Sequence, residues 1–231
     1  PAYNAEKTLE KTVREIPQEV VEEIILVDDK SHDKTVKIAQ KLNLTVFRHR
    51  KNRGYGANQK TCYLLALKHH PDIVVMLHPD YQYDPKIIKY FVEFISEDRF
   101  DVMLGSRIRS RHEALAGGMP LYKYLGNRFL TIIENFVSGY NLSEWHTGMR
   151  AYKREVLENI DFLKNSDDFL FDSQILFQII EKGYRIGEIP VPVRYFPEAS
   201  SINFKRSLKY GLGTLAVATK FLAKKILPWN T

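Results

Sequence analysis

Polar residues able to do chemistry follow directly on one apolar run of this sequence. The run IVVML at positions 73–77 is rich in β-branched residues, which is typical of a strand buried on both faces. Pro79 ends that strand because it has no N–H to donate to a sheet ladder. His78 and Asp80 therefore leave the carboxyl end of a buried strand, where open α/β sheets place their ligand sites. They could share a metal ion, with Gln82 nearby; the alternative is a plain polar turn.

Two adjacent carboxylates occupy the same kind of position after an earlier apolar run. Asp28 and Asp29 come directly after residues 23–27, which predict a second buried strand. At the carboxyl end of that strand they would face the same ligand site. The alternative role for both is capping and turn formation, and Asp33 is expected to cap the helix that follows.

Basic residues mark two further loops. Residues 48–53 form a basic run before the Gly-Tyr-Gly sequence at 54–56, which could contact a phosphate at a helix start. This loop matches neither a P-loop nor a dinucleotide fingerprint. Arg107, Arg109 and Arg111 would share one side of an extended segment, and arginine is well suited to bidentate contact with phosphate. The alternative is an exposed basic loop.

These residues need strands and helices to position them. Apolar runs predict strands at 23–27, 44–47, 73–77 and 101–104, a short strand or turn at 149–152, and an edge segment with two prolines at 186–195. Periodicity, caps and prolines predict helices at 6–16, 34–42, 57–69, 86–95, 120–137, 153–160, 169–182 and 202–227. Asn4 is expected to cap the first helix, and Gly183 to end the one at 169–182. The pattern fits one large α/β domain, or such a domain with an appendage.

Composition and charge limit the function classes. The chain has 231 residues, of which 44% are hydrophobic and 27% charged, and this is ample for a sizeable core. Its net charge of +6 is typical of a solvated surface, and we expect no nucleic-acid partner. The single cysteine, Cys62, excludes an intrachain disulfide and favours a reducing compartment. The sequence shows no signal peptide and no apolar segment of about 18 residues, so we expect a cytoplasmic protein.

The two ends of the sequence carry separate expectations. Pro1 stands in what reads as a strand-to-helix loop, so we expect an upstream strand that this sequence lacks. Near the other end, leucines and lysines mix through Ser201–Lys225, which predicts an amphipathic helix able to lie on the inner face of a membrane. The alternative for this helix is packing on the protein's own core or on a partner subunit, as in a homo-oligomer.

The order of several motifs resembles that of family 2 glycosyltransferases. The motifs are PAYN, LVDDKSHDKT, NRGYGANQK, the strand ending in HPD, GSR, HTGMRAYKREVL and GYRIGEIPVPVRY, and they reach to about Tyr195. The likeness is nearest to the branch of dolichyl- or polyprenyl-phosphate sugar synthases. It implies a GT-A fold at 1–200, a Rossmann-like, mostly parallel sheet flanked by helices, followed by the amphipathic segment at 201–231. It also implies sugar transfer from a nucleotide-sugar, usually with inversion and with Mn²⁺ or Mg²⁺.

The resemblance implies roles for individual residues. Those on the donor side match contacts to the base and ribose of a UDP- or GDP-sugar, and they are Pro1, Ala2, Tyr3 and Asp29, with Asp28 in support. Asp80 matches the second acid of the family's Asp-x-Asp metal motif, and Gln82 matches a glutamine that joins metal or diphosphate binding. Those on the acceptor side are Arg107 and Lys123, which match holders of the acceptor phosphate or leaving diphosphate, and Asp172, which matches acids facing the acceptor.

The sequence departs from the family pattern at two places. His78 stands where the metal motif has its first Asp, and imidazole suits softer metals than Mg²⁺. The sequence EWHTG at 144–148 stands where lipid-phosphate synthases tend to have Asp-Pro-x-Ser-Gly. His146 is therefore a base, a metal ligand or a packing residue.

Acceptor choice decides whether a base is needed. A polyprenyl phosphate is already an anion, whereas a glycan hydroxyl needs a carboxylate or His to take its proton, with Asp172 and His146 as candidates. The alternative function is a degenerate GT-A module that binds a nucleotide-sugar without turnover because His78 weakens the metal site. A nucleotidyltransferase lacks support, since no glycine-rich signature with a following Arg and Lys lies near Pro1.

Overall fold

Two groups of strands form the centre of the protein. The computed structural model describes residues 1–108, 110–116, 118–192 and 204–226. The parallel pair is β1 (Ile25–Asp28) and β2 (Thr45–Arg48). The second sheet has the order β3-β5-β4-β6, built from β3 (Ile73–Met76), β4 (Val102–Ser106), β5 (Arg150–Lys153) and β6 (Ile186–Pro190). Because β5 alone is antiparallel to its neighbours, the expected mostly parallel α/β fold is confirmed.

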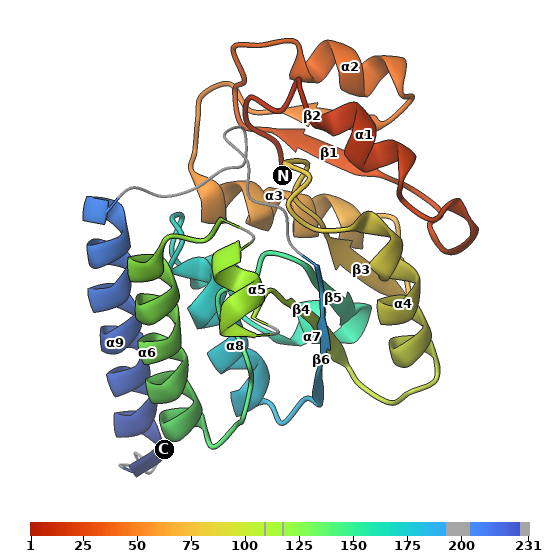
Figure 1. The fold of residues 1–231 in the computed structure, drawn as a ribbon. Helices are drawn as coiled ribbons and strands as arrows, with labels where there is room; N and C mark the ends of the chain where they lie inside the picture. The colour runs from red at the N-terminus through yellow and green to blue at the C-terminus, as the bar shows by residue number, and fades with distance from the viewer. Residues whose placement is uncertain (109, 117, 193–203, 227–231) are drawn as a thin grey trace.

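Helices surround these strands (Figure 1). They are α1 (Leu9–Arg14), α2 (Thr35–Lys41), α3 (Tyr55–Leu67), α4 (Ile88–Ser96), α5 (Arg111–Ala116), α6 (Leu121–Ser138), α7 (Arg154–Asn159), α8 (Phe171–Glu181) and α9 (Phe204–Ile226). Short 3₁₀ turns lie at Gln18–Val20, Pro85–Ile87 and Phe162–Lys164. Gly183, with φ of +76°, follows α8 as expected, because a left-handed residue there costs glycine no steric strain.

The prolines of β6 fit its place in the sheet. β6 is an edge strand, and Pro190 is its last residue, as the sequence predicts. Val191 still donates its N–H to the Ser106 carbonyl at 2.8 Å. The expected strand runs on to Tyr195, and residues 193–195 lie outside the described part of the chain.

The largest apolar cluster joins the sheet to α3, α8 and α9. Trp145 and Phe171 are fully buried in it, and Trp145 packs on Phe177 with ring centroids 4.8 Å apart. α9 contributes the buried Ala218 and also Phe221, whose ring lies 4.7 Å from that of Phe177. The helix expected at 202–227 therefore packs on the protein's own core, with its first two residues and its last outside the described chain.

Three local expectations are wrong. Asn4 does not cap α1; its φ is +52°, and its side-chain oxygen accepts the His32 N–H at 2.9 Å. The N–H groups at the start of α3 are not available to a phosphate, because those of Gly56 and Ala57 bind the Asp167 carbonyl. Arg111 begins α5, so it does not continue an extended segment from Arg107; Arg109 lies outside the described residues.

A cavity of about 600 Å³ separates β1 from β3. Its walls include apolar residues of both strands, such as Leu26, Val74 and Met76, together with Pro1 and Ala2. Ala2 forms a parallel bridge with Asp28. The lining also includes the charged residues Glu22, Glu23 and Asp72. None of the residues predicted to be catalytic lines it, namely Asp80, Arg107, Lys123 and Asp172. No helix in the described part of the chain combines the length and apolar character that a membrane span requires.

Candidate active site

The site is built where β3, β4 and β5 present their neighbouring ends and loops. β3 leads into His78 and Asp80, and β4 leads into Arg107. Arg150 opens β5, opposite Met76 of β3 and Leu104 of β4. Sheet pairing thus brings together residues that are far apart in sequence, as the switch-point rule predicts for strands 73–77 and 101–104.

His78 lies against Tyr55, which also binds Asp172. The imidazole stacks on the Tyr55 ring with centroids 5.3 Å apart, and its Nε2 is 3.3 Å from the Tyr55 hydroxyl. That hydroxyl donates to Asp172 Oδ2 at 2.8 Å. Gly148 makes this arrangement possible, since a Cβ there would lie 2.6 Å from the His78 ring. The structure thus joins the predicted Asp172 to the predicted His78 through a tyrosine.

His78 is held as a neutral imidazole. Burial lowers its pKa, and the positive charges of Arg150 and Arg107 act in the same direction. Neutral imidazole is the form that binds metals. Its Nε2 faces Tyr55, however, and no three His, Cys, Asp or Glu side chains in the described chain are grouped to hold a metal ion. Metal ligation by His78 stays a prediction.

The turn that follows β3 fixes the orientation of the Asp80 carboxylate. Its Oδ1 accepts the Gln82 N–H at 3.2 Å, and the Asp80 side chain is only partly buried. Tyr81 between them has φ of +57°, so the turn is tight. A carboxylate of this kind fits a hard divalent cation, which prefers oxygen ligands. Asp80 therefore fits a metal that takes its remaining ligands from elsewhere.

Asp172 has partners on both carboxylate oxygens. Oδ2 accepts from Tyr55, and Oδ1 accepts from Gln59 Nε2 at 3.2 Å. Arg150 NH2 lies 3.7 Å from Oδ1, and this arginine is fully buried. Burial lowers the pKa of Arg150, but the charges of Asp172 and nearby tyrosines outweigh it and raise that pKa overall. The Asp172 side chain is thus fixed among hydrogen-bond donors and beside the Arg150 guanidinium.

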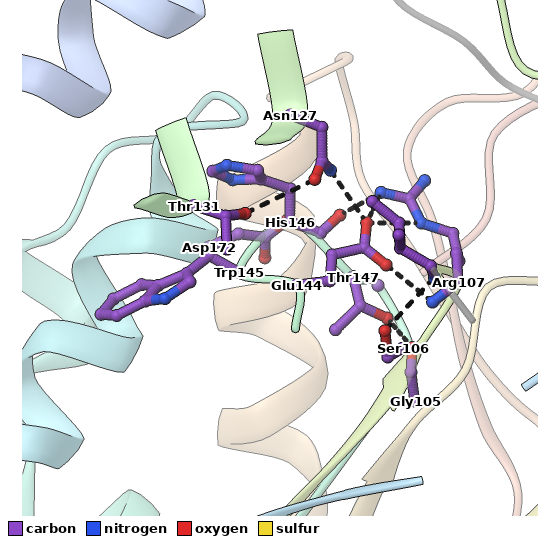
Figure 2. A network of polar contacts seen from close by, with 12 residues as sticks. Gly105, Ser106, Arg107, Asn127, Thr131, Glu144, Trp145, His146, Thr147 and Asp172 are labelled. Carbon is purple, nitrogen blue, oxygen red and sulfur yellow. Dashed lines mark hydrogen bonds and ion pairs between the residues drawn. The ribbon is translucent and has the colours of Figure 1, made fainter. Parts of the chain in front are cut away.

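Arg107 is fixed by an acid that the sequence reading did not assign. Figure 2 shows Glu144 pointing at the Arg107 guanidinium, with Asn127 on its other side. Glu144 accepts from Arg107 Nε at 2.8 Å, from its NH2, and from its backbone N–H at 2.7 Å. The His146 carbonyl accepts from the same NH2 at 2.8 Å. Burial would raise the pKa of Glu144, but the Arg107 charge and hydrogen bonds lower it, so the pair is ionic.

Lys123 stands near this pair on α6. Burial lowers its pKa, and the like charge of Arg107 lowers it further. The cation–π contact of Lys123 with Tyr122 is weak, since the Lys123 Nζ lies 6.0 Å from the centroid of the Tyr122 ring. The two predicted acceptor-side cations therefore share one neighbourhood, and α6 supplies one of them.

The donor-side residues lie around the end of β1. The Ala2 N–H donates to the Val27 carbonyl at 2.8 Å, and the Asp29 N–H donates to the Ala2 carbonyl at 2.8 Å. Asp28 is fully buried and ion-paired with Arg48 at 3.1 Å, which fits a supporting role. Tyr3 is half exposed, and Pro1 precedes the bridge.

Asp29 holds the neighbouring loop. Its carboxylate accepts the N–H groups of Arg53 at 2.8 Å and Gly54 at 3.0 Å, and it pairs with His49 Nδ1 at 2.8 Å. The side chain is almost fully buried. These contacts match the alternative turn-forming role, and the nucleotide contact of Asp29 stays a prediction.

His146 packs between two helices. Its Nδ1 lies 2.6 Å from the Tyr210 hydroxyl of α9, and its Nε2 lies 3.2 Å from Glu134 Oε2 of α6, an ion-pair distance without hydrogen-bond alignment. Glu134 is fully buried. Of the three roles left open for His146, these contacts favour packing.

Sequence reading missed several residues that shape the site. They are Tyr55, Gln59, Tyr83, Asn127, Glu144 and Arg150. Arg150 stood inside the quoted HTGMRAYKREVL motif, and Glu144 opened the divergent EWHTG segment. A buried Arg and a buried Glu each require an opposite charge, which was the signal available.

Comparison with known proteins identifies the family. A family model described as glycosyl transferase family 2 matches residues 1–161. The chain belongs to glycosyltransferase family 2. This glycosyltransferase is 30% identical over 196 residues to the dolichyl-phosphate hexose transferase of Haloferax volcanii, covering 83% of this chain and 79% of the relative. It is 28% identical over 212 residues to the UDP-N-acetylglucosamine–dolichyl-phosphate N-acetylglucosaminyltransferase of Methanococcus voltae, covering 84% of each.

Solved structures confirm the GT-A-like fold of the glycosyltransferase. Glucosyl-3-phosphoglycerate synthase from Mycobacterium tuberculosis, in complex with phosphoglyceric acid, superposes with a TM-score of 0.73 at 16% identity, covering 96% of this chain and 78% of that one. The same enzyme in complex with Mn²⁺, UDP-glucose and phosphoglyceric acid gives a TM-score of 0.71, also at 16% identity and with the same coverage.

Proposed function

We propose that this glycosyltransferase moves a sugar, with inversion, from a UDP- or GDP-sugar to a polyprenyl phosphate. The observation that carries the proposal is the state of the two candidate bases. Asp172 has partners on both carboxylate oxygens, and His146 is enclosed by Tyr210 and Glu134. Neither is placed to take a proton from a sugar hydroxyl, whereas an acceptor phosphate is already ionised and needs no base.

The charges beside these residues suit an anionic acceptor. Arg107 is locked in place by Glu144, and Lys123 adds a second positive charge nearby. The Nε and NH2 groups of Arg107 are bound by Glu144 and the His146 carbonyl, so Arg107 would act on a phosphate through the positive charge of a guanidinium held in one orientation. The same two cations would stabilise the negative charge that develops on the leaving diphosphate. A cation already fixed in place does so without the side chain having to move during the reaction.

The donor is proposed to bind along the end of β1. Pro1, Ala2 and Tyr3 would contact the base and ribose, with Asp29 ordering the loop beside them. Asp80 would hold Mn²⁺ or Mg²⁺, and Gln82 would assist at the diphosphate. When bound, the metal supplies Lewis-acid stabilisation of the leaving phosphate oxygens.

Relatives support both substrates. The names of the Methanococcus and Haloferax relatives both combine dolichyl phosphate with transfer of a sugar. The Mycobacterium synthase binds UDP-glucose together with Mn²⁺. The alternative is a degenerate module that binds a nucleotide-sugar without turnover. His78 Nε2 already contacts the Tyr55 hydroxyl, so metal binding would depend on Asp80, and the alternative would hold if Asp80 binds no metal.

The test measures acceptor choice. UDP- and GDP-sugars are supplied with Mn²⁺ and with either a short-chain polyprenyl phosphate, the matching polyprenol, or a free sugar. We expect nucleoside diphosphate release and glycolipid formation with the phosphate alone. Transfer to the polyprenol or free sugar at an equal rate would contradict the proposal, and donor binding without any turnover would favour the degenerate module.

A further inference from the structure

The outer face of α6 is apolar along its whole length. Every residue that α6 exposes is hydrophobic or glycine, and these are Leu121, Tyr122, Leu125, Gly126, Phe129, Ile132 and Phe136. Phe136 is 84% exposed, although it is one of the largest apolar side chains. Their spacing of three and four residues places them on one side of the helix. A surface helix of a globular protein normally shows polar residues on that side, so this face is built to contact something.

α9 continues the same surface. It lies beside α6 at the edge of the molecule (Figure 1), and Gly211 of α9 faces Leu130 of α6. α9 packs its buried residues on the core and exposes Leu208, Leu212 and Ile226 at helical spacing. We define the docking face as the exposed apolar residues of α6 together with these three residues of α9.

The exposed charges that α6 and α9 themselves carry have one sign. Lys209, Lys220, Lys224 and Lys225 are exposed on α9, and Lys224 pairs with Glu181 of the neighbouring α8. Among the described side chains of the two helices, the only carboxylate is Glu134, and it is buried. A second copy of the chain would bring lysines against lysines. An anionic lipid surface offers both an apolar interior and negative headgroups, so it matches both halves of the pattern.

The inner face of α6 belongs to the active site. Asn127 donates to Glu144 Oε1 at 3.1 Å, and Lys123 lies near Arg107. One helix therefore has the acceptor-side charges on one face and the apolar residues on the other. A lipid-linked phosphate is anchored at the bilayer surface, and a helix lying in that surface would bring Lys123 to the level of the headgroups.

We propose that the docking face of α6 and α9 lies in the headgroup region of an anionic bilayer and presents the active site to a membrane-held acceptor. The second half of this statement rests on the proposed function, whereas the first half does not. The docking face differs from the segment Ser201–Lys225 expected from the sequence, because α6 provides most of it.

The test compares two matched variants of the full chain. In the docking face, Phe129→Gln and Phe136→Gln are combined; the control is Leu163→Gln, a residue 53% exposed on the turn at Phe162–Lys164. Binding is measured by sedimentation with phosphatidylcholine vesicles with and without phosphatidylglycerol, in the absence of donor and acceptor. We expect the wild-type chain and the control to bind the anionic vesicles, and the double variant to bind at least about tenfold more weakly. Circular dichroism and thermal unfolding establish that each variant is folded.

Three outcomes would overturn the proposal. One is equal vesicle binding by the double variant and the wild type. Another is wild-type binding that does not increase with phosphatidylglycerol. The third is a wild-type dimer that the double variant abolishes, because it would assign the face to a second copy. Turnover of a water-soluble short-chain acceptor is measured separately on the same variants, and its absence in the wild type would count against the proposed function alone.

Discussion

At the scale of single residues, the acceptor-side Arg107 depends on an acid outside the reaction. Glu144 fixes Arg107 through three hydrogen bonds and is itself positioned by Asn127. It touches no reacting atom in the proposed mechanism, so it is a positioning residue. Its effect on turnover must therefore pass through Arg107.

Replacing Glu144 tests this dependence. Glu144→Gln removes the charge that holds the guanidinium, and one charge-assisted hydrogen bond contributes about 1.5–3 kcal/mol. We expect kcat to fall about tenfold or more, with donor affinity nearly unchanged. Initial rates and donor titration provide the measurement, and Glu155→Gln at an exposed position serves as the control. An equal loss of donor affinity would place the pair on the donor instead.

Asp80 carries the metal proposal. Asp80→Ala is expected to abolish metal-dependent nucleoside diphosphate release and to leave the circular dichroism spectrum unchanged, because the side chain lies in a partly buried turn. A loss of more than about a hundredfold is expected for removing the main protein ligand. Normal turnover of Asp80→Ala with Mn²⁺ would remove this residue from the mechanism.

Single residues could be predicted where their chemistry is local. His78, Asp80 and Arg107 are strand-end residues, and they lie in the site because strand ends meet there. The ion pair of Arg107 with Glu144 could not be predicted, since 37 positions separate its members and pairing depends on how β4 meets the EWHTG segment. The position of Asp29 at a strand end could also be predicted, but its role could not. Its carboxylate binds the N–H groups of the loop at Arg53 and Gly54.

At the scale of elements, close backbone approach fixes how α3 meets the segment before α8. A Cβ on Gly56 would lie 2.4 Å from the Ser166 carbonyl oxygen, so the backbone would have to move. A Cβ added to Gly126 in α6 would have no atom within 4 Å. The two glycines therefore predict opposite effects of one substitution.

Gly56→Ala should destabilise the fold by about 3 kcal/mol, because overpacking against backbone cannot relax cheaply. Gly126→Ala should stabilise it by about 0.5–1 kcal/mol, since alanine loses less conformational freedom in a helix. Urea unfolding of both variants measures the difference in the free energy of unfolding. The packing argument fails if Gly56→Ala is as stable as the wild type.

Asp101 links β4 to the strands beside it. It accepts from Lys153 at 2.8 Å and from Arg185 at 2.9 and 3.1 Å, and it is mostly buried. The hydrogen bonds from Arg185 hold the pKa of Asp101 well below its usual 3.8, despite the opposing effect of burial. Because the folded-state pKa is lowered, this contribution to stability is present above about pH 4 and is lost as the pH falls further.

Asp101→Asn should therefore cost about 2 kcal/mol at neutral pH. The difference from the wild type should shrink as pH falls from about 5 to about 2. Urea unfolding across that range is the measurement. Asp161→Asn, at an exposed pair with Lys164, is the control and should change little. A cost that is independent of pH would show that Asp101 acts through packing alone.

The sequence predicted which segments are helices and strands better than it predicted where each one lies in the fold. The strand or turn expected at 149–152 became β5, a central antiparallel strand, because its neighbours β3 and β4 lie on both sides of it. Four residues of mixed polarity do not reveal that position. The expected cap at Asn4 failed because the residue enters a left-handed turn instead.

At the scale of the whole molecule, α9 is part of the core. Its Thr214 and Ala218 are buried, and Phe221 packs on Phe177. A chain ending at residue 195 should therefore lose several kcal/mol of stability, since it exposes the apolar surface that α9 covers. Thermal unfolding of that truncated chain is the measurement. Retention of the wild-type melting temperature would show that α9 is an independent appendage.

Packing of α9 was one of two readings that its sequence allowed. Leucines mixed with lysines serve equally for a membrane and for a core, and only the neighbouring helices decide which residues face inward. The docking face itself could not be read from α6 alone, since its apolar residues look like core positions until the structure shows them uncovered.

The two faces of α6 also limit how this enzyme can evolve. Inward positions such as Asn127 and Glu134 are fixed by the site and by His146, while outward positions are fixed by their environment. A helix used on both sides has few neutral positions, so drift along it should be slow. In a mutational scan under growth selection, polar substitutions at Phe129 or Phe136 would be depleted. In a scan scored only by protein abundance, the same substitutions would be enriched.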